Sequence, residues 1–376
     1  MNRAERTVRG LLDGTGVELN GDRPSDLRVI DDRFYERVLS DGSIGFGEAY
    51  MDGWWECEAL DVMIDRLLRA DLESRVSPAK LILPVLYAKL VNRQRRSRAF
   101  DVATRHYDLG NELYRRMLDR RMTYTCGYWE HAEDLDQAQE HKLDLTCRKM
   151  ELAPGMRVLD IGCGWGSFAG FAAERYGVEV VGVTVSKEQV ELGREMTSGL
   201  PVDLRLQDYR EVEGTYDRIV SLGMFEHVGL KNYEIFMQVV LRCLKDDGLF
   251  LLHTIGTNTS ATAVDPWTDK HIFPGGMLPT AARISAAVEG RLVIEDWHNF
   301  GLDYDPTLMA WMANVDRHRH ELQDLGYDER FYRMWRFFLL SSAGGFRARR
   351  NHLWQIVLSK PGYSGRYRSV RGPAPR

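Results

Sequence analysis

Hydrophobic residues from position 158 onward follow two patterns that alternate along the chain. Short apolar runs of the length of a buried strand are each followed by a segment in which apolar residues recur every three or four positions, as on one face of a helix. Such alternation predicts a doubly wound α/β sheet whose parallel strands are joined by right-handed crossovers. The predicted strands are residues 158–161, 178–185, 202–207, 216–222, 248–253, 292–297 and 353–359. Residues 258–287 are interpreted as a long insertion, and helices are predicted at residues 307–325 and 329–340.

The first predicted strand leads into a glycine-rich turn. Its apolar residues surround Asp160, and the sequence Gly162-Cys163-Gly164-Trp165-Gly166 follows directly. Glycine lets a backbone approach a ligand closely because no side chain intervenes. A helix is expected to start near Ser167, which is a good N-cap residue. A tight strand-to-helix turn that binds nothing would show the same glycines, so the neighbouring segments decide between the two interpretations.

The spacing of the glycines restricts the ligand that this turn can hold. A dinucleotide fingerprint has glycines spaced G-x-G-x-x-G and an acid about 20 residues later. This turn reads G-x-G-x-G, and the second predicted strand ends at residues 182–186 without an acid. The Gly-Lys-Ser/Thr ending of a phosphate-binding loop is also missing from the turn. The pattern therefore favours the class I methyltransferase fold, a Rossmann-like α/β sheet that binds S-adenosylmethionine over its first strand-to-helix turn.

Polar residues stand at the carboxyl ends of the predicted strands, where ligands bind in doubly wound sheets. Asp208 is expected to accept a hydrogen bond from the adenine amino group, with a solvated strand-end acid as the alternative. Asp160 is expected to fix the glycine turn and the methionine end of the cosubstrate. Thr184, Ser186 and Gln189 are candidates for the ribose, although an N-cap role for Ser186 is equally open.

Four further residues are harder to explain as structure. Glu226 and His253 stand near the ends of two predicted strands, and Cys126 and Tyr304 are the other polar candidates. A Glu, a His and a Tyr that are buried together at the mouth of one binding site would need polar partners or a bound ion. Taken alone, His253 is more often a satisfied core residue than a catalyst, so that alternative stays open.

The chain is long enough for a second, smaller domain ahead of the sheet. Residues 1–98 are predicted to form a mainly helical N-terminal domain for contact with lipid or with a second subunit, residues 99–360 the catalytic domain, and residues 361–376 a disordered basic tail. The glycine- and aromatic-rich residues 42–55 are interpreted as a packed loop with two Trp in a core. The alternative is an apolar groove for acyl chains, since Trp suits the boundary of lipid and water.

The distribution of charge and the cysteines indicate which partners and which cellular compartment to expect. Residues 75–98 contain seven Lys/Arg and no acid, and residues 343–376 contain eight and no acid, although the net charge is −5. Such segments suggest contact with anionic lipid or nucleic acid, with a solvated surface as the alternative. The five scattered cysteines lack a C-x-x-C pair, which fits reduced thiols in a cytoplasm and offers no metal site. We expect no membrane-spanning segment and no signal peptide.

Several local sequences are similar to those of the cyclopropane fatty acid synthase family. The resemblance is highly specific and runs from about residue 15 to 360, so that it includes the N-terminal domain of the long bacterial members. The matching segments are residues 50–55, 106–111, 223–229, 251–256, 296–301, 304–311 and 345–349.

The resemblance implies methyl transfer from S-adenosylmethionine to a cis double bond of a phospholipid acyl chain, followed by deprotonation of the carbocation and ring closure. It also implies a bicarbonate ion as the base, with Glu226 and His253 as a pair that orients it. Tyr304 would donate a hydrogen bond to the ion, and the backbones of Cys126 and Ile255 would contact it. An S-adenosylmethionine-dependent methyltransferase that makes methylene- or methyl-branched acyl chains, or that methylates an amine, is the alternative.

The family also implies a cosubstrate site and a cellular setting. A homodimer is expected by analogy, on the inner face of an anionic membrane and without nucleic acid, because the basic segments lack the interleaved aromatics of a stacking platform. The expected cosubstrate residues are Tyr124, Thr125, Asp160, Gly162, Cys163, Gly164, Thr184, Ser186, Lys187, Gln189, Asp208 and Tyr209.

Overall fold

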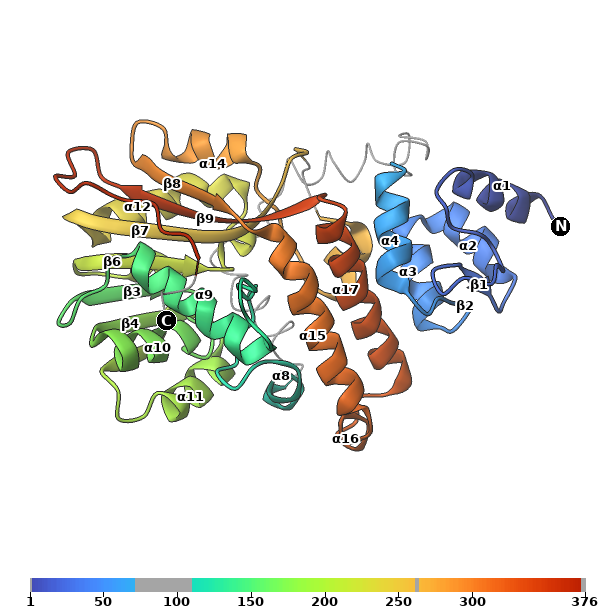
Figure 1. Ribbon diagram of the computed structural model, residues 1–376, viewed down its shortest axis with the longest axis horizontal. Coiled ribbons are helices and arrows are strands. Elements are labelled where there is room, and N and C mark those ends of the chain that lie inside the picture. The colour runs from blue at the N-terminus through green and yellow to red at the C-terminus, as the bar shows by residue number, and fades with distance from the viewer. Residues whose placement is uncertain (1, 72–109, 261–263, 373–376) are drawn as a thin grey trace. The chain divides into compact units, whose positions relative to one another are not determined.

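The computed structural model describes residues 2–71, 110–260 and 264–372 (Figure 1). The chain divides into two compact units. The first comprises residues 1–91, 262–274 and 304–351, and the second comprises residues 92–261, 275–303 and 352–376. The basic segment 75–98 and the boundary predicted at residue 98 lie outside the described residues. Within the described ranges, no helix is both long and apolar enough to cross a bilayer.

The second unit contains the predicted seven-stranded sheet, in the order β5-β4-β3-β6-β7-β9-β8. The pairs from β5 through β7 are parallel, and β8 and β9 are antiparallel to each other. The prediction of a class I methyltransferase fold is therefore confirmed. The strands are β3 (Arg157–Ile161), β4 (Glu179–Thr184), β5 (Val202–Leu206), β6 (Tyr216–Leu222), β7 (Leu244–Thr257), β8 (Val293–Asn299) and β9 (Asn351–Ser359).

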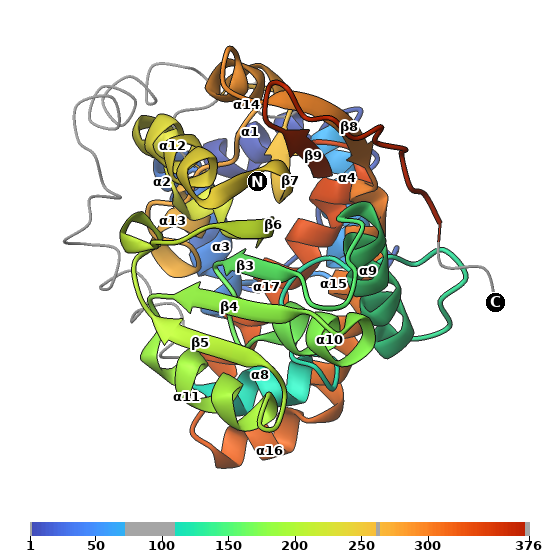
Figure 2. The ribbon, with the colours of Figure 1, turned by 90° about the vertical axis from the view of Figure 1, so that its left-hand side faces the viewer.

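Helices cover both faces of this sheet, which explains why its central strands are apolar on both sides. On one face α9 and α10 pack through a cluster that includes Leu143, Cys147 and Phe168, and on the other α12 and α14 pack through Phe236 and Ile284 (Figure 2). The described α-helices of this unit are α8 (Asn111–Met117), α9 (Leu135–Lys149), α10 (Ser167–Tyr176), α11 (Lys187–Met196), α12 (Tyr233–Cys243) and α14 (Ala281–Val288).

The first unit is mainly helical and is organised around Trp55, whose side chain is fully buried. The indole stacks on Phe46 with ring centroids 4.4 Å apart, and its Nε1 donates to the Phe46 carbonyl at 2.9 Å. Residues 43–51 form a helix rather than the predicted loop, so the packed-core interpretation holds with a different local structure. The elements are α1 (Arg3–Leu12), β1 (Arg28–Val29), α2 (Arg33–Asp41), α3 (Ser43–Met51), β2 (Trp55–Glu56), α4 (Leu60–Arg69), α13 (Pro266–His271), α15 (Tyr304–Arg317), α16 (Arg319–Asp324) and α17 (Glu329–Arg347).

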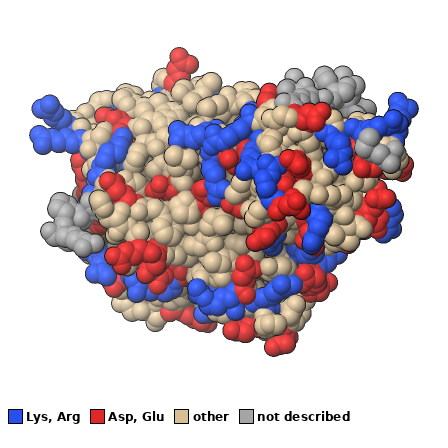
Figure 3. Space-filling model, turned by 45° about the vertical axis from the view of Figure 1, so that its right-hand side comes forward, with Lys and Arg blue, Asp and Glu red and all other residues tan. Residues whose placement is uncertain are grey.

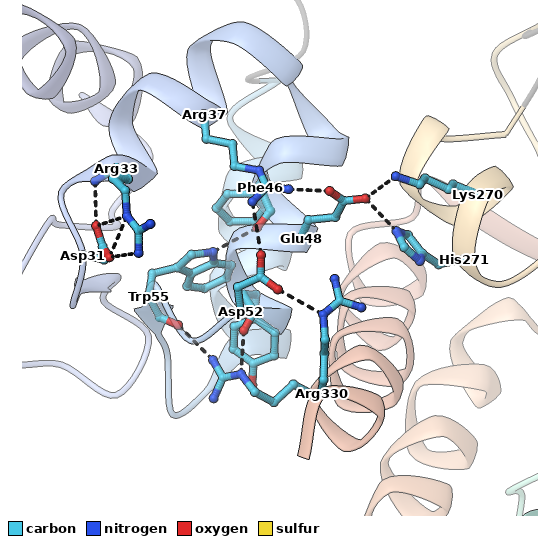
Figure 4. Close-up of polar contacts among 12 residues, drawn as sticks. Asp31, Arg33, Arg37, Phe46, Glu48, Asp52, Trp55, Lys270, His271 and Arg330 are labelled. Atoms are coloured by element: carbon cyan, nitrogen blue, oxygen red, sulfur yellow. Dashed lines mark hydrogen bonds and ion pairs between the residues drawn. The ribbon is translucent and has the colours of Figure 1, made fainter. Parts of the chain in front are cut away.

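A buried carboxylate on α3 joins this helix to α13 (Figure 4). Glu48 accepts hydrogen bonds from Lys270 and His271 of α13 and from Arg37 of α2. These donors outweigh the burial of the carboxylate and lower the pKa of Glu48 to about 2. Next to Glu48 on the same helix, Gly47 lies against the indole of Trp267. The insertion predicted at residues 258–287, between the fifth and sixth predicted strands, therefore has structure of its own.

Two other predictions need correction. The single helix predicted at residues 307–325 is divided into α15 and α16, and the helix predicted at residues 329–340 continues to Arg347. The basic tail, for which the sequence predicts disorder, makes specific contacts over its described residues 361–372. Arg371 pairs with Asp296 at 2.6 Å, and the Gly372 carbonyl accepts from Arg148 at 2.5 Å.

Gly47→Ala is expected to lower the free energy of unfolding by about 1–3 kcal/mol, because the added methyl overpacks a filled site. A Cβ at Gly47 would lie 2.4 Å from Cδ1 of Trp267, which is rigid and 2% exposed. Gly10→Ala is the matched control, because nothing lies within 4 Å of a Cβ there and Ala favours a helix. Urea unfolding of both variants tests this, and equal stability of the two would contradict it.

Candidate active site

The glycine turn after β3 has a left-handed backbone at each of its three glycines. The φ angles of Gly162, Gly164 and Gly166 are +85°, +54° and +79°, a region that residues with a Cβ rarely adopt. Gly166, rather than the predicted Ser167, occupies the N-cap position of α10. A Cβ at Gly162 would lie 2.5 Å from Met224, whereas at Gly164 it would meet only Gln189 Nε2, at 3.9 Å. The turn thus leaves open backbone at Gly164 on which a ligand could pack.

Asp160 lies beneath this turn and is only 2% exposed. Among the described residues, its Oδ1 atom has no hydrogen-bond partner. Burial raises the pKa of Asp160 to about 7, although the nearby ammonium of Lys142 opposes the shift. An unpartnered buried carboxylate oxygen fits a polar ligand on the turn, as expected for the cationic methionine end of S-adenosylmethionine.

The end of β4 is occupied by a small polar network. Thr184 donates to Oε1 of Gln189 at 3.0 Å, and Ser186 Oγ accepts from the Gln189 backbone N–H at 3.4 Å. Ser186 therefore has the N-cap role that the sequence left open, at the start of α11. The side chain of Lys187 is 76% exposed and pairs with Glu191, so it is not gathered with these residues.

Asp208 is buried at the end of β5, which makes the interpretation as a solvated acid wrong. Its carboxylate accepts from the backbone N–H of Arg210 at 2.9 Å and from the Arg210 guanidinium at 2.8 Å. Asp208 thus caps a short 3-10 helix, and an adenine contact would have to use its remaining acceptor capacity. Tyr209 belongs to the hydrophobic core and packs against Phe236, with ring centroids 5.4 Å apart.

Residues 124–126 lie beside the end of β6. The Thr125 carbonyl accepts from Gln139 at 2.7 Å, its hydroxyl accepts from Lys142 Nζ at 2.8 Å, and its methyl lies 2.8 Å from where a Cβ of Gly223 would be. The Tyr124 ring lies 5.1 Å from that of Tyr114. Cys126 is fully buried, and its thiol donates to the Gly127 carbonyl at 3.1 Å.

Glu226 and His253 are both buried near the carboxyl end of β6. Glu226 follows this strand in a short 3-10 helix, and His253 of β7 pairs with Leu222, the last residue of β6. Glu226 Oε1 accepts from the backbone N–H of Ile255 at 2.7 Å, while its Oε2 has no partner among the described residues. His253 Nδ1 lies 3.3 Å from Nε2 of Gln355, and its own Nε2 is likewise unpartnered in the described chain. The Ile255 N–H thus holds Glu226 and the Gln355 amide contacts His253, and the joint role of the two side chains in orienting bicarbonate stays a prediction.

Burial sets the protonation of this pair of side chains. It raises the pKa of Glu226 to about 7 and lowers the pKa of His253 well below its usual range. Two unpartnered polar atoms in a dry site fit a small polar ligand such as bicarbonate. Tyr304 begins α15 in the first unit, where it is 8% exposed and stacks on Phe346 with ring centroids 4.5 Å apart.

The sequence did not indicate a buried polar face of α9. Gln139, Lys142, Thr146 and Lys149 recur on one side of this helix, and all four are fully buried. Burial lowers the pKa of Lys142 to about 8 and that of Lys149 to about 7. The spacing of three or four residues between these four side chains was a usable signal. Polar residues at such spacing, however, normally indicate the solvated face of a helix.

Two partners from β8 and β9 complete this network. Lys149 Nζ lies 2.9 Å from Nδ1 of His298 and 2.8 Å from Oε1 of Gln355. Burial, followed by the charge of Lys149, lowers the pKa of His298 to about 3. Gln355 also contacts Thr146 Oγ1, at 3.1 Å. Polar side chains of α9, β8 and β9 thus form a connected network that reaches Nδ1 of His253 through Gln355.

Lys149 is expected to make the stability of the protein depend on pH above neutrality. Because its folded pKa is lowered to about 7, the unfolded chain binds more protons between that value and the usual lysine range. The free energy of unfolding should therefore gain a rising contribution with pH over this interval, of up to about 1.4 kcal/mol per pH unit. Urea unfolding from pH 7 to 9 measures this slope. Lys149→Met should lose the contribution, whereas the exposed-lysine control Lys231→Met should keep it.

Known proteins resemble this chain over both its units. The family model described as mycolic acid cyclopropane synthetase matches residues 94–356. The cyclopropane-fatty-acyl-phospholipid synthase of Escherichia coli strain K12 is 50% identical over 356 residues, which cover 94% of this chain and 93% of that protein. The tuberculostearic acid methyltransferase UfaA1 of Mycobacterium tuberculosis is 31% identical over 383 residues, with 96% of this chain and 87% of that protein covered.

Solved structures resemble a shorter part of the chain. The mycolic acid cyclopropane synthase CmaA1, in complex with SAH and CTAB, superposes with a TM-score of 0.64 and 31% identity. The superposition covers 69% of this chain and 98% of CmaA1, whereas the Escherichia coli relative matches nearly the whole chain. The resemblance inferred from the sequence is confirmed. The chain belongs to the S-adenosylmethionine-dependent methyltransferases of the mycolic acid cyclopropane synthetase family and shares nearly its full length with a bacterial cyclopropane-fatty-acyl-phospholipid synthase.

Proposed function

We propose that this protein is a cyclopropane-fatty-acyl-phospholipid synthase. It would add a one-carbon unit from S-adenosylmethionine across a cis double bond of a phospholipid acyl chain. The observation that carries the proposal is the 50% identity, over 94% of this chain, to the Escherichia coli protein of that name. The geometry supports it through the open backbone at Gly164, the buried Asp160 and the unpartnered atoms of Glu226 and His253.

The chemistry explains why such a site must be dry. When bound, S-adenosylmethionine supplies an electrophilic methyl group, and bicarbonate supplies a weak base for the proton lost on ring closure. An alkene is a poor nucleophile, so the side chains must exclude water and hold the reactants in line. Glu226, fixed through Oε1 by the Ile255 N–H, would use Oε2 to hold the ion, and His253 would use Nε2. The proposed roles of Tyr304 and of the Cys126 backbone rest on the family resemblance.

A methyltransferase that makes branched acyl chains is the second candidate. It is favoured by the 31% identity to tuberculostearic acid methyltransferase UfaA1 over 96% of this chain. Both reactions begin with methyl transfer to a double bond and differ in the fate of the carbocation. The product therefore distinguishes them.

The expected partners are an anionic membrane surface and a second copy of the chain, with action from the cytoplasmic face. Among the described basic residues of the C-terminal segment, Arg347, Arg350, Lys360 and Arg371 are in ion pairs within the chain, whereas Arg349, Arg366 and Arg368 are the ones that could face a membrane. Acidic and basic side chains also intermingle on the face drawn in Figure 3. The membrane proposal therefore rests mainly on the seven Lys/Arg of residues 75–98.

Purified protein, incubated with S-adenosylmethionine and vesicles of an unsaturated phospholipid, is expected to produce a cyclopropane ring in the acyl chains. Mass spectrometry should show the addition of one CH₂, and proton NMR should show the upfield ring-methylene signal. Vesicles of the saturated phospholipid are the control and should remain unmodified. Added mass without the ring signal would favour the branching alternative, and no product on bound vesicles would contradict both proposals.

Glu226→Gln and His253→Ala are expected to retain S-adenosylmethionine binding but to lose turnover about 10²–10⁴-fold, because the base can no longer be oriented. Removal of CO₂ and bicarbonate should lower the turnover of the wild type, and adding bicarbonate back should restore it. Calorimetry measures cosubstrate binding, and product NMR measures turnover. Glu213→Gln makes the same chemical change at an exposed position and should match the wild type. Loss of cosubstrate binding in either site variant would show that the role is misassigned.

A further inference from the structure

The hydrogen bonds behind His253 fix the orientation of a buried glutamine. Gln355 on β9 is fully buried, and both ends of its amide meet polar atoms. The hydroxyl of Thr146 donates to the carbonyl of Lys142 at 2.8 Å, so its hydrogen is already committed. Thr146 Oγ1 can then only accept from Gln355, at 3.1 Å, which requires an amide NH₂ on that side.

The opposite end of the amide gives the same assignment. Lys149 Nζ lies 2.8 Å from the other atom of the Gln355 amide, and the ammonium form of Lys149, which prevails below its pKa of about 7, can only donate hydrogen bonds. That atom must therefore be the carbonyl oxygen Oε1. A reversed amide would place two donors together at Lys149 and two acceptors together at Thr146. The two contacts are independent, and they agree.

We infer that Gln355 sets the tautomer of His253, because its anchored NH₂ group donates to Nδ1 and leaves the imidazole proton on Nε2. The contact joins Gln355 Nε2 and His253 Nδ1 at 3.3 Å. Nδ1 must then be the acceptor, and the N–H of a neutral ring lies on the other nitrogen. That nitrogen, Nε2, is the buried atom for which the described residues offer no partner. Lys149 and Gln355 are thus positioning residues for His253.

A neutral imidazole is what makes the tautomer matter. Burial, together with the charges of Lys142 and Lys149, lowers the pKa of His253 well below its usual range, so the ring carries one proton. An N–H at Nε2 can donate to an anionic oxygen, whereas a lone pair at Nε2 would repel it. This catalytic consequence rests on the proposed function, while the hydrogen-bond assignment does not.

Gln355→Glu is the sharpest test, because it keeps the shape of the side chain and removes its donor. The carboxylate would accept from Lys149 and would also require a donor at His253 Nδ1, which moves the imidazole proton. We expect turnover to fall about 10²–10⁴-fold, as for a catalytic histidine held in the wrong tautomer, with unchanged S-adenosylmethionine binding. Gln238→Glu on the exposed face of α12 makes the same substitution and should leave turnover unchanged.

The tautomer itself can be observed in the full chain. Long-range ¹H–¹⁵N NMR of ¹⁵N-histidine-labelled protein distinguishes protonation at Nε2 from protonation at Nδ1, and His253→Gln identifies the signal. The wild type should show the proton on Nε2, and Gln355→Glu should show it on Nδ1. If Gln355→Glu does not fold, Lys149→Met removes the anchor of the amide and should give a mixture of both tautomers.

The possible outcomes separate the two proposals. A proton on Nδ1 in the wild type, or an unchanged tautomer in Gln355→Glu, overturns the inference whatever the enzyme makes. A changed tautomer with full turnover supports the hydrogen-bond assignment and overturns the role of His253 in the proposed function. A changed tautomer with lost turnover and retained cosubstrate binding supports both.

Discussion

The arrangement of the second unit depends on how it compensates for the free-energy cost of removing polar side chains from water. Asp160, Glu226, His253, Lys142 and Lys149 are all nearly or fully buried at one side of a sheet that is otherwise packed with apolar residues. Each must find a hydrogen-bond partner or shift its pKa toward the neutral form. The structure uses both solutions. Lys149 has Gln355 as a hydrogen-bond partner and Glu226 has the Ile255 N–H, yet burial still shifts the pKa of each to about 7. Burial raises the pKa of Asp160 to about 7 as well.

The carboxyl edge of the parallel strands concentrates these groups because β3, β4, β5 and β6 end close together, beside His253 of β7. The register pairs Thr184 with Leu206 and Leu222 with His253, so residues far apart in sequence reach the same edge. The helix α9 then brings a second set of polar side chains from a position before the sheet begins. Its apolar residues, such as Leu143 and Cys147, join the core on the face that also holds α10. One helix thus serves packing and chemistry.

Most of the sheet could be predicted because strands such as β4 and β9 contain apolar runs bounded by polar residues or glycine, and every predicted strand is present. The helix at residues 43–51 was missed because its glycines lower helix propensity, and packing of Phe46 against Trp55 overrides this preference. The tail was misjudged because its order depends on a distant partner, Asp296, which composition cannot reveal. Candidate residues at strand ends were found. The lysines of α9 were not, because their burial depends on tertiary contacts with Gln355 and Thr125.

The division of the chain into segments that alternate between the two units constrains how the protein can change. The chain passes from one unit to the other five times, so no single cut in the sequence separates them. The segment that contains α13 leaves the sheet unit after β7, and its Lys270 and His271 bind Glu48, more than 200 residues earlier. A recombination event that exchanged only the N-terminal residues would replace Glu48 and Gly47, and Lys270, His271 and Trp267 would then lose the residues that they contact. The N-terminal helices and this distant segment should therefore vary together in evolution, as one inherited block that is discontinuous in the gene.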